Sequence, residues 1–237
     1  MVMPPAMFFA WNFYRFRGKE IKFRRLWISM ALLTITTVIT SLQFVFPEII
    51  NVLNRNGDAL FAGELWRLIT PLFIQPMGIW QCFFNGLFFI SFVPLAEHLY
   101  GRSFLLIYFG VSSVVQLIIL YWETTPGGLP TAGGGSSSAL YAVIGALFSY
   151  ILINRERFAK GYILIPIAGF LGATILLFFE DGHAPAVLMG GLLGFFLVRK
   201  SNRFWFLNDW NWGIKLWMRN TAAYKGLSAM LASEYIL

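Results

Sequence analysis

The sequence predicts an all-α, polytopic membrane protein built from six transmembrane helices. Of its 237 residues, 58% are hydrophobic and 12% are charged, and a water-soluble domain has too little buried volume to hide so much apolar surface. The apolar residues gather in six separate stretches, and the basic residues fall in alternate loops between them. These three observations together predict a helical membrane bundle and exclude an ordinary soluble domain.

Each apolar stretch is near the length of about 20 residues that crosses a hydrocarbon core about 30 Å thick. The last three are short or contain glycine, which suits helices that pack against one another rather than facing lipid throughout. The predicted spans are 26–46, 80–98, 103–122, 136–153, 161–179 and 184–198. They form a membrane domain, residues 26–198, between a basic N-terminal arm (1–25) and an aromatic-rich tail (199–237).

Basic residues predict the orientation, because short loops rich in Lys and Arg stay on the cytoplasmic side. Six precede the first span, and others lie before the third and fifth spans and after the sixth, whereas loops 123–135 and 180–183 contain none. The first outer loop, 47–79, is the exception, with Arg55 and Arg67. Both termini are therefore predicted to be cytoplasmic. The net charge of +7 follows from this topology, so we expect no nucleic-acid partner.

The sequence also argues against a cleavable signal peptide, an intrachain disulfide and a metal site. The apolar start of the chain precedes the basic cluster instead of following it, so we expect no cleavable signal peptide. Cys82 is the only cysteine, which excludes an intrachain disulfide and a cysteine metal site, and we expect neither metal nor cofactor. The tail carries four tryptophans among polar residues, a pattern typical of an anchor at the membrane–water interface, with a partner-docking surface as the alternative.

Candidate catalytic residues gather at the predicted outer face. A glycine-rich run ends in Ser136, Ser137 and Ser138, where the fourth span begins, and its glycines allow backbone N–H groups to point at a reacting oxygen. Helix-capping serines are the plain alternative. The two histidines lie at opposite faces, with His98 inside and His183 outside, at the start of the sixth span. His183 is thus the one imidazole able to activate a serine there, unless it is a solvated loop residue.

The residues around His183 are typical of a helix start with proline in its first turn. A helix N-terminus disfavours a cationic imidazole, which would keep the ring able to accept a proton, whereas Asp181 or Glu180 would act in the opposite direction. Ala186 and Gly190 follow His183 on one helical face. This small-xxx-small spacing predicts close packing against a neighbouring helix.

The stretch 135–145 resembles the G-x-S segment of the rhomboid intramembrane serine proteases. In this register Gly135 is the leading glycine, Ser137 is the nucleophile, and Tyr141 and Gly145 match the family's tyrosine and second glycine. The residues from His183 are similar to the family's H-x-x-G-x-x-x-G, with Ala186 at the first glycine and Gly190 at the second. Upstream matches complete the resemblance, which runs in the family's order over about 63–198: Trp66-Arg67 (W-R), Asn85, and Glu97 with Gly101 (E-x-x-x-G).

The resemblance implies a six-helix rhomboid-like bundle and cleavage of a peptide bond in or near a transmembrane helix of another protein, without a cofactor. His183 would take the proton of Ser137, and Tyr141 would pack against the imidazole. The backbone N–H of Ser137 and the Asn85 side chain would hold the oxyanion, with Gln81 as a further donor. The partners implied are transmembrane protein substrates and membrane lipids. No oligomeric state follows from the sequence.

Three positions depart from the family pattern: Ser138 replaces a usual glycine, Gln81 a usual histidine, and Ala186 the first glycine after the base. A second alignment would place Gly190 and Gly194 at the two glycines and leave Val187 at the position of the base. A proteolytically inactive rhomboid-like protein that binds membrane clients therefore stays open as an alternative. A small transporter or channel is disfavoured, because the spans contain almost no ionisable residues.

Overall fold

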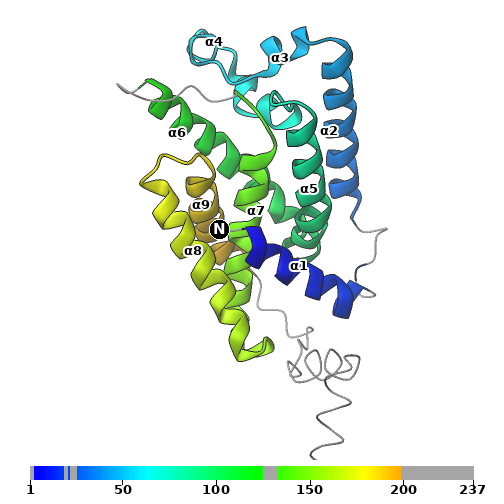
Figure 1. The fold of residues 1–237 in the computed structure, drawn as a ribbon, viewed down its shortest axis with the longest axis vertical. Helices are drawn as coiled ribbons and strands as arrows, with labels where there is room; N and C mark the ends of the chain where they lie inside the picture. Colours follow the sequence, from blue (N-terminus) through cyan, green and yellow to red (C-terminus); the bar gives the residue numbers. More distant parts are fainter. Residues whose placement is uncertain (1–2, 19–20, 22–25, 125–132, 199–237) are drawn as a thin grey trace, which may run out of the picture.

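The computed structural model describes residues 3–18, 21, 26–124 and 133–198, and every regular element within them is helical (Figure 1). In this part of the chain, four helical segments are long and apolar enough to cross a membrane: α2 (Trp27–Val45), Ile79–Ser103, Leu106–Thr124 and Lys160–Leu177. Two shorter apolar helices, α7 (Ser137–Ile153) and α9 (His183–Leu197), coincide with the fourth and sixth predicted spans. The prediction of an all-helical membrane protein is confirmed, while the predicted tail lies outside the described residues.

Within these segments the helices are interrupted by tighter or wider turns. Helix α5 (Ile79–Tyr100) continues into the 3₁₀ turn Gly101–Ser103. A π-helical stretch (Leu106–Val111) precedes α6 (Ser112–Thr124), and a 3₁₀ turn (Lys160–Ile163) precedes α8 (Leu164–Leu177). The other described elements are short or lie before the spans: α1 (Met3–Arg17), α3 (Glu48–Leu53), α4 (Gly57–Phe61), and 3₁₀ helices Leu65–Leu68, Thr70–Phe73 and Arg155–Arg157.

Helix α1, within the predicted basic arm, was not anticipated from the sequence. It lies across α5 and α8 (Figure 1). Its buried side holds Phe9, whose ring centroid is 5.9 Å from that of Phe158, and Phe13, 6.0 Å from the His98 ring. Trp11 on its other side is 67% exposed. A helix of 15 residues is short for a membrane crossing, and its exposed tryptophan is suited to the membrane–water interface.

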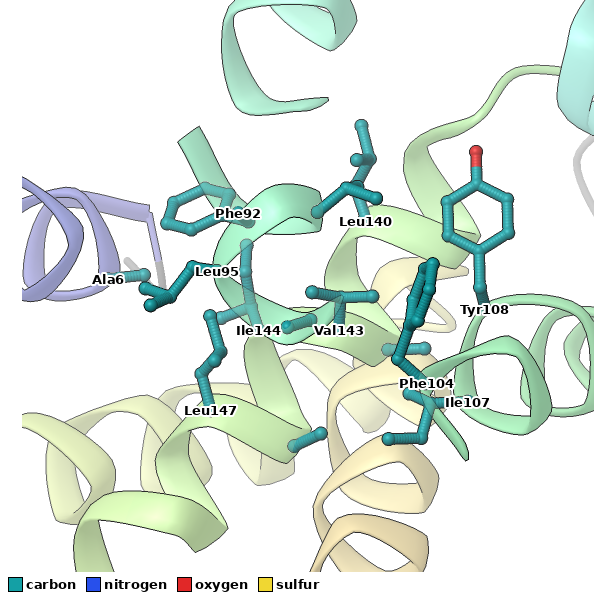
Figure 2. Close-up of a cluster of buried hydrophobic side chains, with 14 of the residues drawn as sticks. Ala6, Phe92, Leu95, Phe104, Ile107, Tyr108, Leu140, Val143, Ile144 and Leu147 are labelled. Atoms are coloured by element: carbon teal, nitrogen blue, oxygen red, sulfur yellow. The ribbon is translucent and has the colours of Figure 1, made fainter. Parts of the chain in front are cut away.

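Helix α7 forms the centre of the bundle. Between Ser138 and Ile151, every residue except Tyr141 is buried, and Figure 2 shows its Leu140 and Val143 in one cluster with Phe92 of α5 and Phe104. The outer helices are apolar on their exposed faces too, as the large side chains there demonstrate: Val38, Leu42, Phe84, Leu87, Ile90, Ile167, Leu171, Leu192, Phe195 and Phe196. An apolar exterior around an apolar centre is expected of a protein whose solvent is lipid.

Helices α7 and α9 approach each other until backbone touches backbone. A Cβ atom on Gly145 would lie 2.0 Å from the carbonyl oxygen of Val187, and one on Gly190 would lie 2.1 Å from that of Ala142. Ala186 is fully buried and carries its methyl group within the same helix pair. This is the close packing that the small-residue spacing predicts.

Glu97 joins α5 to the start of α2. Its carboxylate accepts hydrogen bonds from the N–H groups of Ile28 (3.2 Å) and Ser29 (2.7 Å) and from the Ser29 hydroxyl (2.5 Å). The residue that precedes α2, Leu26, provides no side-chain cap. Glu97 therefore satisfies donors that a helix start leaves without acceptors. Gly101, four residues later, ends α5 at a φ of +59°, which glycine adopts without strain.

Replacing Glu97 with alanine is expected to lower the free energy of unfolding by about 3 kcal/mol, because the buried donors at the α2 start lose their acceptor. Reversible denaturant titration in detergent measures this. Glu156→Ala is the control, because Glu156 is an exposed acid in the turn after α7. Equal stability of the two variants would show that the Glu97 carboxylate is not an effective cap.

Candidate active site

A pocket of about 180 Å³ is lined by residues from the starts of three helices. Ser137 is the first residue of α7, His183 is the first residue of α9, and Gln81 lies in the first turn of α5. The glycine run 133–135 and Arg55 also line it. The N-terminal ends of helices present N–H groups and positive dipole ends, so a pocket at which they converge favours developing negative charge.

The three consecutive serines have different surroundings. Ser136 is buried, and its hydroxyl lies 3.4 Å from the Gln75 amide nitrogen, which donates to it. The Ser138 hydroxyl is also buried and has no hydrogen-bond partner among the described residues. Ser137 and Ser138 both line the pocket, and Ser137 is the one of the three serines that is partly exposed. A nucleophile must be open to substrate, and among these serines that condition favours Ser137.

The His183 ring is held on two sides. Tyr141, one turn after Ser137 on α7, contacts it with a centroid separation of 4.4 Å. On its edge, Nδ1 lies 2.9 Å from Oδ1 of Asp181, which also accepts the backbone N–H of His183 at 2.8 Å. The hydrogen bond with His183 holds the pKa of Asp181 below its usual value. The charge of Asp181 was anticipated from the sequence but its hydrogen bond was not, although an Asp two residues before a helix start is a common local hydrogen-bond acceptor.

Ser137 and His183 line the same pocket but are not hydrogen-bonded to each other in the described structure. Across the described ranges, no hydrogen bond joins the Ser137 hydroxyl to the imidazole. Catalytic hydrogen bonds are often long in unoccupied sites and tighten when substrate binds. The arrangement supplies a serine, an imidazole and helix N-termini in one place. Among the residues that the structure describes, no group of three His, Cys, Asp or Glu side chains is placed to hold a metal ion.

Asn85 and Gln81 are both engaged with protein groups. Asn85 donates to the side-chain oxygen of Gln75 (2.7 Å), and the Gln75 backbone is held in turn by the Gln43 amide from α2. Asn85 faces a separate groove between α2 and α5 rather than the Ser137 pocket. Gln81 lines the Ser137 pocket and donates to the carbonyl of Gly134 (3.0 Å). Gln75 was not anticipated from the sequence, because its contacts depend on three separate segments of the chain.

Gly135 lies close to the side-chain amides of Gln81 and Asn85, in the loop that precedes Ser137. Its φ is +134°, its N–H donates to the Pro71 carbonyl at 2.7 Å, and a Cβ atom there would lie 2.3 Å from Gln81 Nε2. The same Cβ atom would lie 3.7 Å from Asn85 Nδ2. The backbone conformation requires glycine at this position, and a side chain there would displace the Gln81 amide. Gly135 thus brings two amide donors near the loop that carries Ser137.

Trp66 and Arg67 lie away from the pocket, in the first loop. Arg67 donates to the Asn54 carbonyl (2.8 Å) and pairs with Glu64 (2.6 Å), while Trp66 is 50% exposed. Arg67 therefore orders the loop, and Trp66 has the exposure of an interfacial residue. Arg55 is likewise paired, with Glu123 at 2.8 Å, so both arginines that break the predicted charge pattern have a carboxylate partner.

Comparison with known proteins identifies one family. The model of the Rhomboid domain matches residues 62–200, a stretch that contains every residue described in the pocket except Arg55. Among curated proteins of Bacillus subtilis (strain 168), "Putative rhomboid protease YdcA" is 29% identical over 147 residues, covering 60% of this chain and 71% of the relative. "Rhomboid protease GluP" is 29% identical over 151 residues, covering 61% of this chain and 27% of the relative.

Proposed function

Because the chain belongs to the rhomboid family and is an integral membrane protein, we propose that it is an intramembrane serine endopeptidase that uses a dyad of Ser137 and His183. Its substrates are transmembrane or juxtamembrane segments of other membrane proteins. The observation that carries the proposal is the common pocket of Ser137 and His183, which come from different helices and are separated by 45 residues of sequence. Tyr141 supports the same pairing, since it follows Ser137 by one turn and contacts the imidazole.

In the proposed reaction, His183 removes the proton of Ser137 as the serine oxygen attacks the scissile carbonyl carbon. The protonated imidazole then donates this proton to the leaving amine, and an acyl-enzyme remains. Water, activated by the neutral imidazole, hydrolyses the ester and releases the second product. The polar residues and the glycine run that line the pocket provide a path for this water at the membrane boundary.

The oxyanion formed in each step is assigned to three donors. Ser137 begins α7, and its N–H is one of the four at a helix start that lack an intrahelical acceptor. Gln81 lines the pocket and needs only to release the Gly134 carbonyl, whereas Asn85 must release Gln75. Each such donor is typically worth about 3 kcal/mol of transition-state stabilisation. Gln81 fills this role by donation, since an amide does not titrate as the family's usual histidine does.

The proposed topology has six crossings, with both termini in the cytoplasm and the active site open to the outer face. Support comes from the ends of α5. Gln81, near its start, lines the pocket, whereas His98, near its end, contacts Phe13 of α1, the helix that carries basic Arg15. The pocket and helix α1 therefore lie toward opposite ends of α5, which supports the topology proposed from the charge pattern.

A client-binding protein without protease activity is the second candidate. Two observations favour it: within the described residues the Ser137 hydroxyl and the imidazole form no hydrogen bond, and Asn85 is turned toward Gln75. Ser138 and Gln81 also differ from the family pattern. Such a protein would keep the bundle and bind transmembrane segments without cutting them.

Labelling by a fluorophosphonate probe decides between the two candidates. The wild-type protein in detergent is expected to be labelled, and Ser137→Ala is expected to abolish the label because only an activated serine attacks the probe. Ser136→Ala and Ser138→Ala are matched controls, one residue to either side, and should remain labelled. No labelling of folded wild-type protein would favour the client-binding function, and loss of label only in a control would reassign the nucleophile.

A further inference from the structure

Asp181 holds the Nδ1 edge of the His183 ring. It sits in the turn between α8 and α9, and one oxygen, Oδ1, serves both the backbone N–H (2.8 Å) and the ring Nδ1 (2.9 Å) of His183. The turn is itself fixed. The Asp181 carbonyl accepts the N–H of Ala184 (2.9 Å), and Gly182 packs so closely on Ile119 of α6 that a Cβ atom there would be 2.8 Å away.

This contact determines which ring nitrogen carries the proton. A carboxylate is a hydrogen-bond acceptor only, so the short distance to Nδ1 requires a proton on Nδ1. In a neutral imidazole, Nε2 is then unprotonated and able to accept a proton. A general base for Ser137 needs this tautomer, with the acceptor nitrogen free of other partners. The Tyr141 ring restrains the imidazole from one face, so both the tautomer and the ring position are constrained.

We propose that Asp181 is a positioning residue for His183, which extends the proposed dyad to a Ser137–His183–Asp181 triad. The inference rests on the proposed function for its catalytic meaning. In this role Asp181 acts through His183, by holding the imidazole with Nε2 as the acceptor. It also stabilises the imidazolium that forms while the proton is in transit, against the opposing effect of the α9 N-terminus.

The charges around the ring leave this role to Asp181. Arg55 of the first loop lines the same pocket, but its guanidinium is paired with Glu123 and Gln116 of α6. Tyr141 of α7 contacts the ring as an uncharged phenol. The hydrogen bond to His183 favours the ionised form of Asp181, whose pKa lies below its usual value. Because His183 and Asp181 are 41% and 34% exposed, hydrogen-bond geometry rather than long-range charge carries the effect.

Nitrogen NMR of ¹⁵N-histidine-labelled protein in detergent tests the positioning without any need for catalysis. At a pH where the ring is neutral, wild-type His183 is expected to show a protonated Nδ1 and an unprotonated Nε2, with His183→Ala identifying its signals against those of His98. Asp181→Ala should shift the ring to a mixture of tautomers. Asp181→Asn should keep the wild-type tautomer, because the backbone N–H of His183 still orients the amide oxygen toward Nδ1. Unchanged ring signals in Asp181→Ala overturn the proposal.

The rate of fluorophosphonate labelling supplies the catalytic readout. Asp181→Ala is expected to slow labelling by about ten- to hundredfold, and Asp181→Asn by less, with the melting temperature of each close to wild type. With a transmembrane substrate, the loss should fall on kcat and leave KM unchanged. Glu180→Gln is the matched control, since Glu180 is the adjacent acid, is exposed, and makes no side-chain hydrogen bond to His183 in the described structure.

The two readouts separate this inference from the proposed function. If the wild-type protein is not labelled but its ring tautomer responds to Asp181→Ala, the protease assignment fails and the positioning role holds. If the wild-type protein is labelled and Asp181→Ala is labelled equally fast, the protease assignment holds and the positioning role is wrong. Should Asp181→Ala fail to fold, Asp181→Ser replaces it in the same two measurements with the same expected results, because a hydroxyl can donate as well as accept and so does not require a proton on Nδ1.

Discussion

Replacement of His183 by alanine is expected to reduce the cleavage rate of a transmembrane substrate by about 10⁵-fold, the largest functional effect that we anticipate. The Ser137 hydroxyl is barely ionised near neutral pH, so loss of its base leaves it almost unreactive. Losing one member of a catalytic serine–histidine pair costs nearly as much as losing the whole set. Cleavage of a membrane-protein reporter in proteoliposomes measures this effect, with the fall expected in kcat.

His98→Ala is the matched control, because it removes the other histidine of the chain. His98 lies near the end of α5 and contacts Phe13 of α1, whereas the pocket includes the start of the same helix. Its replacement should leave the cleavage rate within a few-fold of wild type. A His183→Ala protein that retains wild-type activity would show that another group activates the serine, and the dyad would then be wrong.

Much of the fold is predictable because lipid imposes a simple rule on sequence. A span must be long and apolar, so composition alone locates α2 and α5 to within a few residues. Helix α1 escapes this rule because it lies across the bundle and, at 15 residues, is shorter than a span, within a segment that the charge pattern assigns to an arm. Span prediction tests hydrophobic length, so it does not detect an apolar helix that is shorter than a span.

The membrane topology made it possible to predict which candidate residues lie at the same face, but not their contacts. Counting crossings assigns Ser137 and His183 to one face, and the structure places both in one pocket. The partners of Asn85 and His183 were not predictable in the same way. Asn85 meets Gln75 through a loop held by Gln43, and Asp181 meets the imidazole in a turn where Glu180 has a φ of +54°. Such contacts depend on side-chain direction and backbone conformation, which motif spacing does not specify.

The departure at Ala186 has a simple physical meaning once the α7–α9 contact is known. Ala186 is fully buried with its methyl group accommodated, whereas a Cβ atom at Gly190 or Gly145 would collide with backbone of the opposite helix. Glycine is therefore needed at Gly145 and Gly190, where α7 and α9 approach most closely, but not at every small residue between these two helices. The alternative alignment would make Val187 the base, yet Val187 is fully buried, with its carbonyl against Gly145.

Gly190→Ala is expected to lower the free energy of unfolding by about 3 kcal/mol, the largest stability effect of a single added methyl group that we anticipate. The new Cβ atom would lie 2.1 Å from the Ala142 carbonyl oxygen and 2.6 Å from its Cα atom. Both are backbone atoms, so no rotamer change relieves the collision, and the helices must separate. Separation moves His183 away from Ser137, so fluorophosphonate labelling should fall together with stability in a denaturant titration.

Gly86→Ala separates this steric effect from the general effect of glycine in a helix. Gly86 lies inside α5, and a Cβ atom there meets nothing within 4 Å. Alanine is favoured over glycine inside a helix by about 1 kcal/mol, so Gly86→Ala should leave stability unchanged or raise it. The two variants add the same methyl group and are expected to change stability in opposite directions. If both variants were as stable as wild type, α9 would not contact the α7 backbone at Gly190. The inference that this close contact brings the imidazole to the serine would then be wrong.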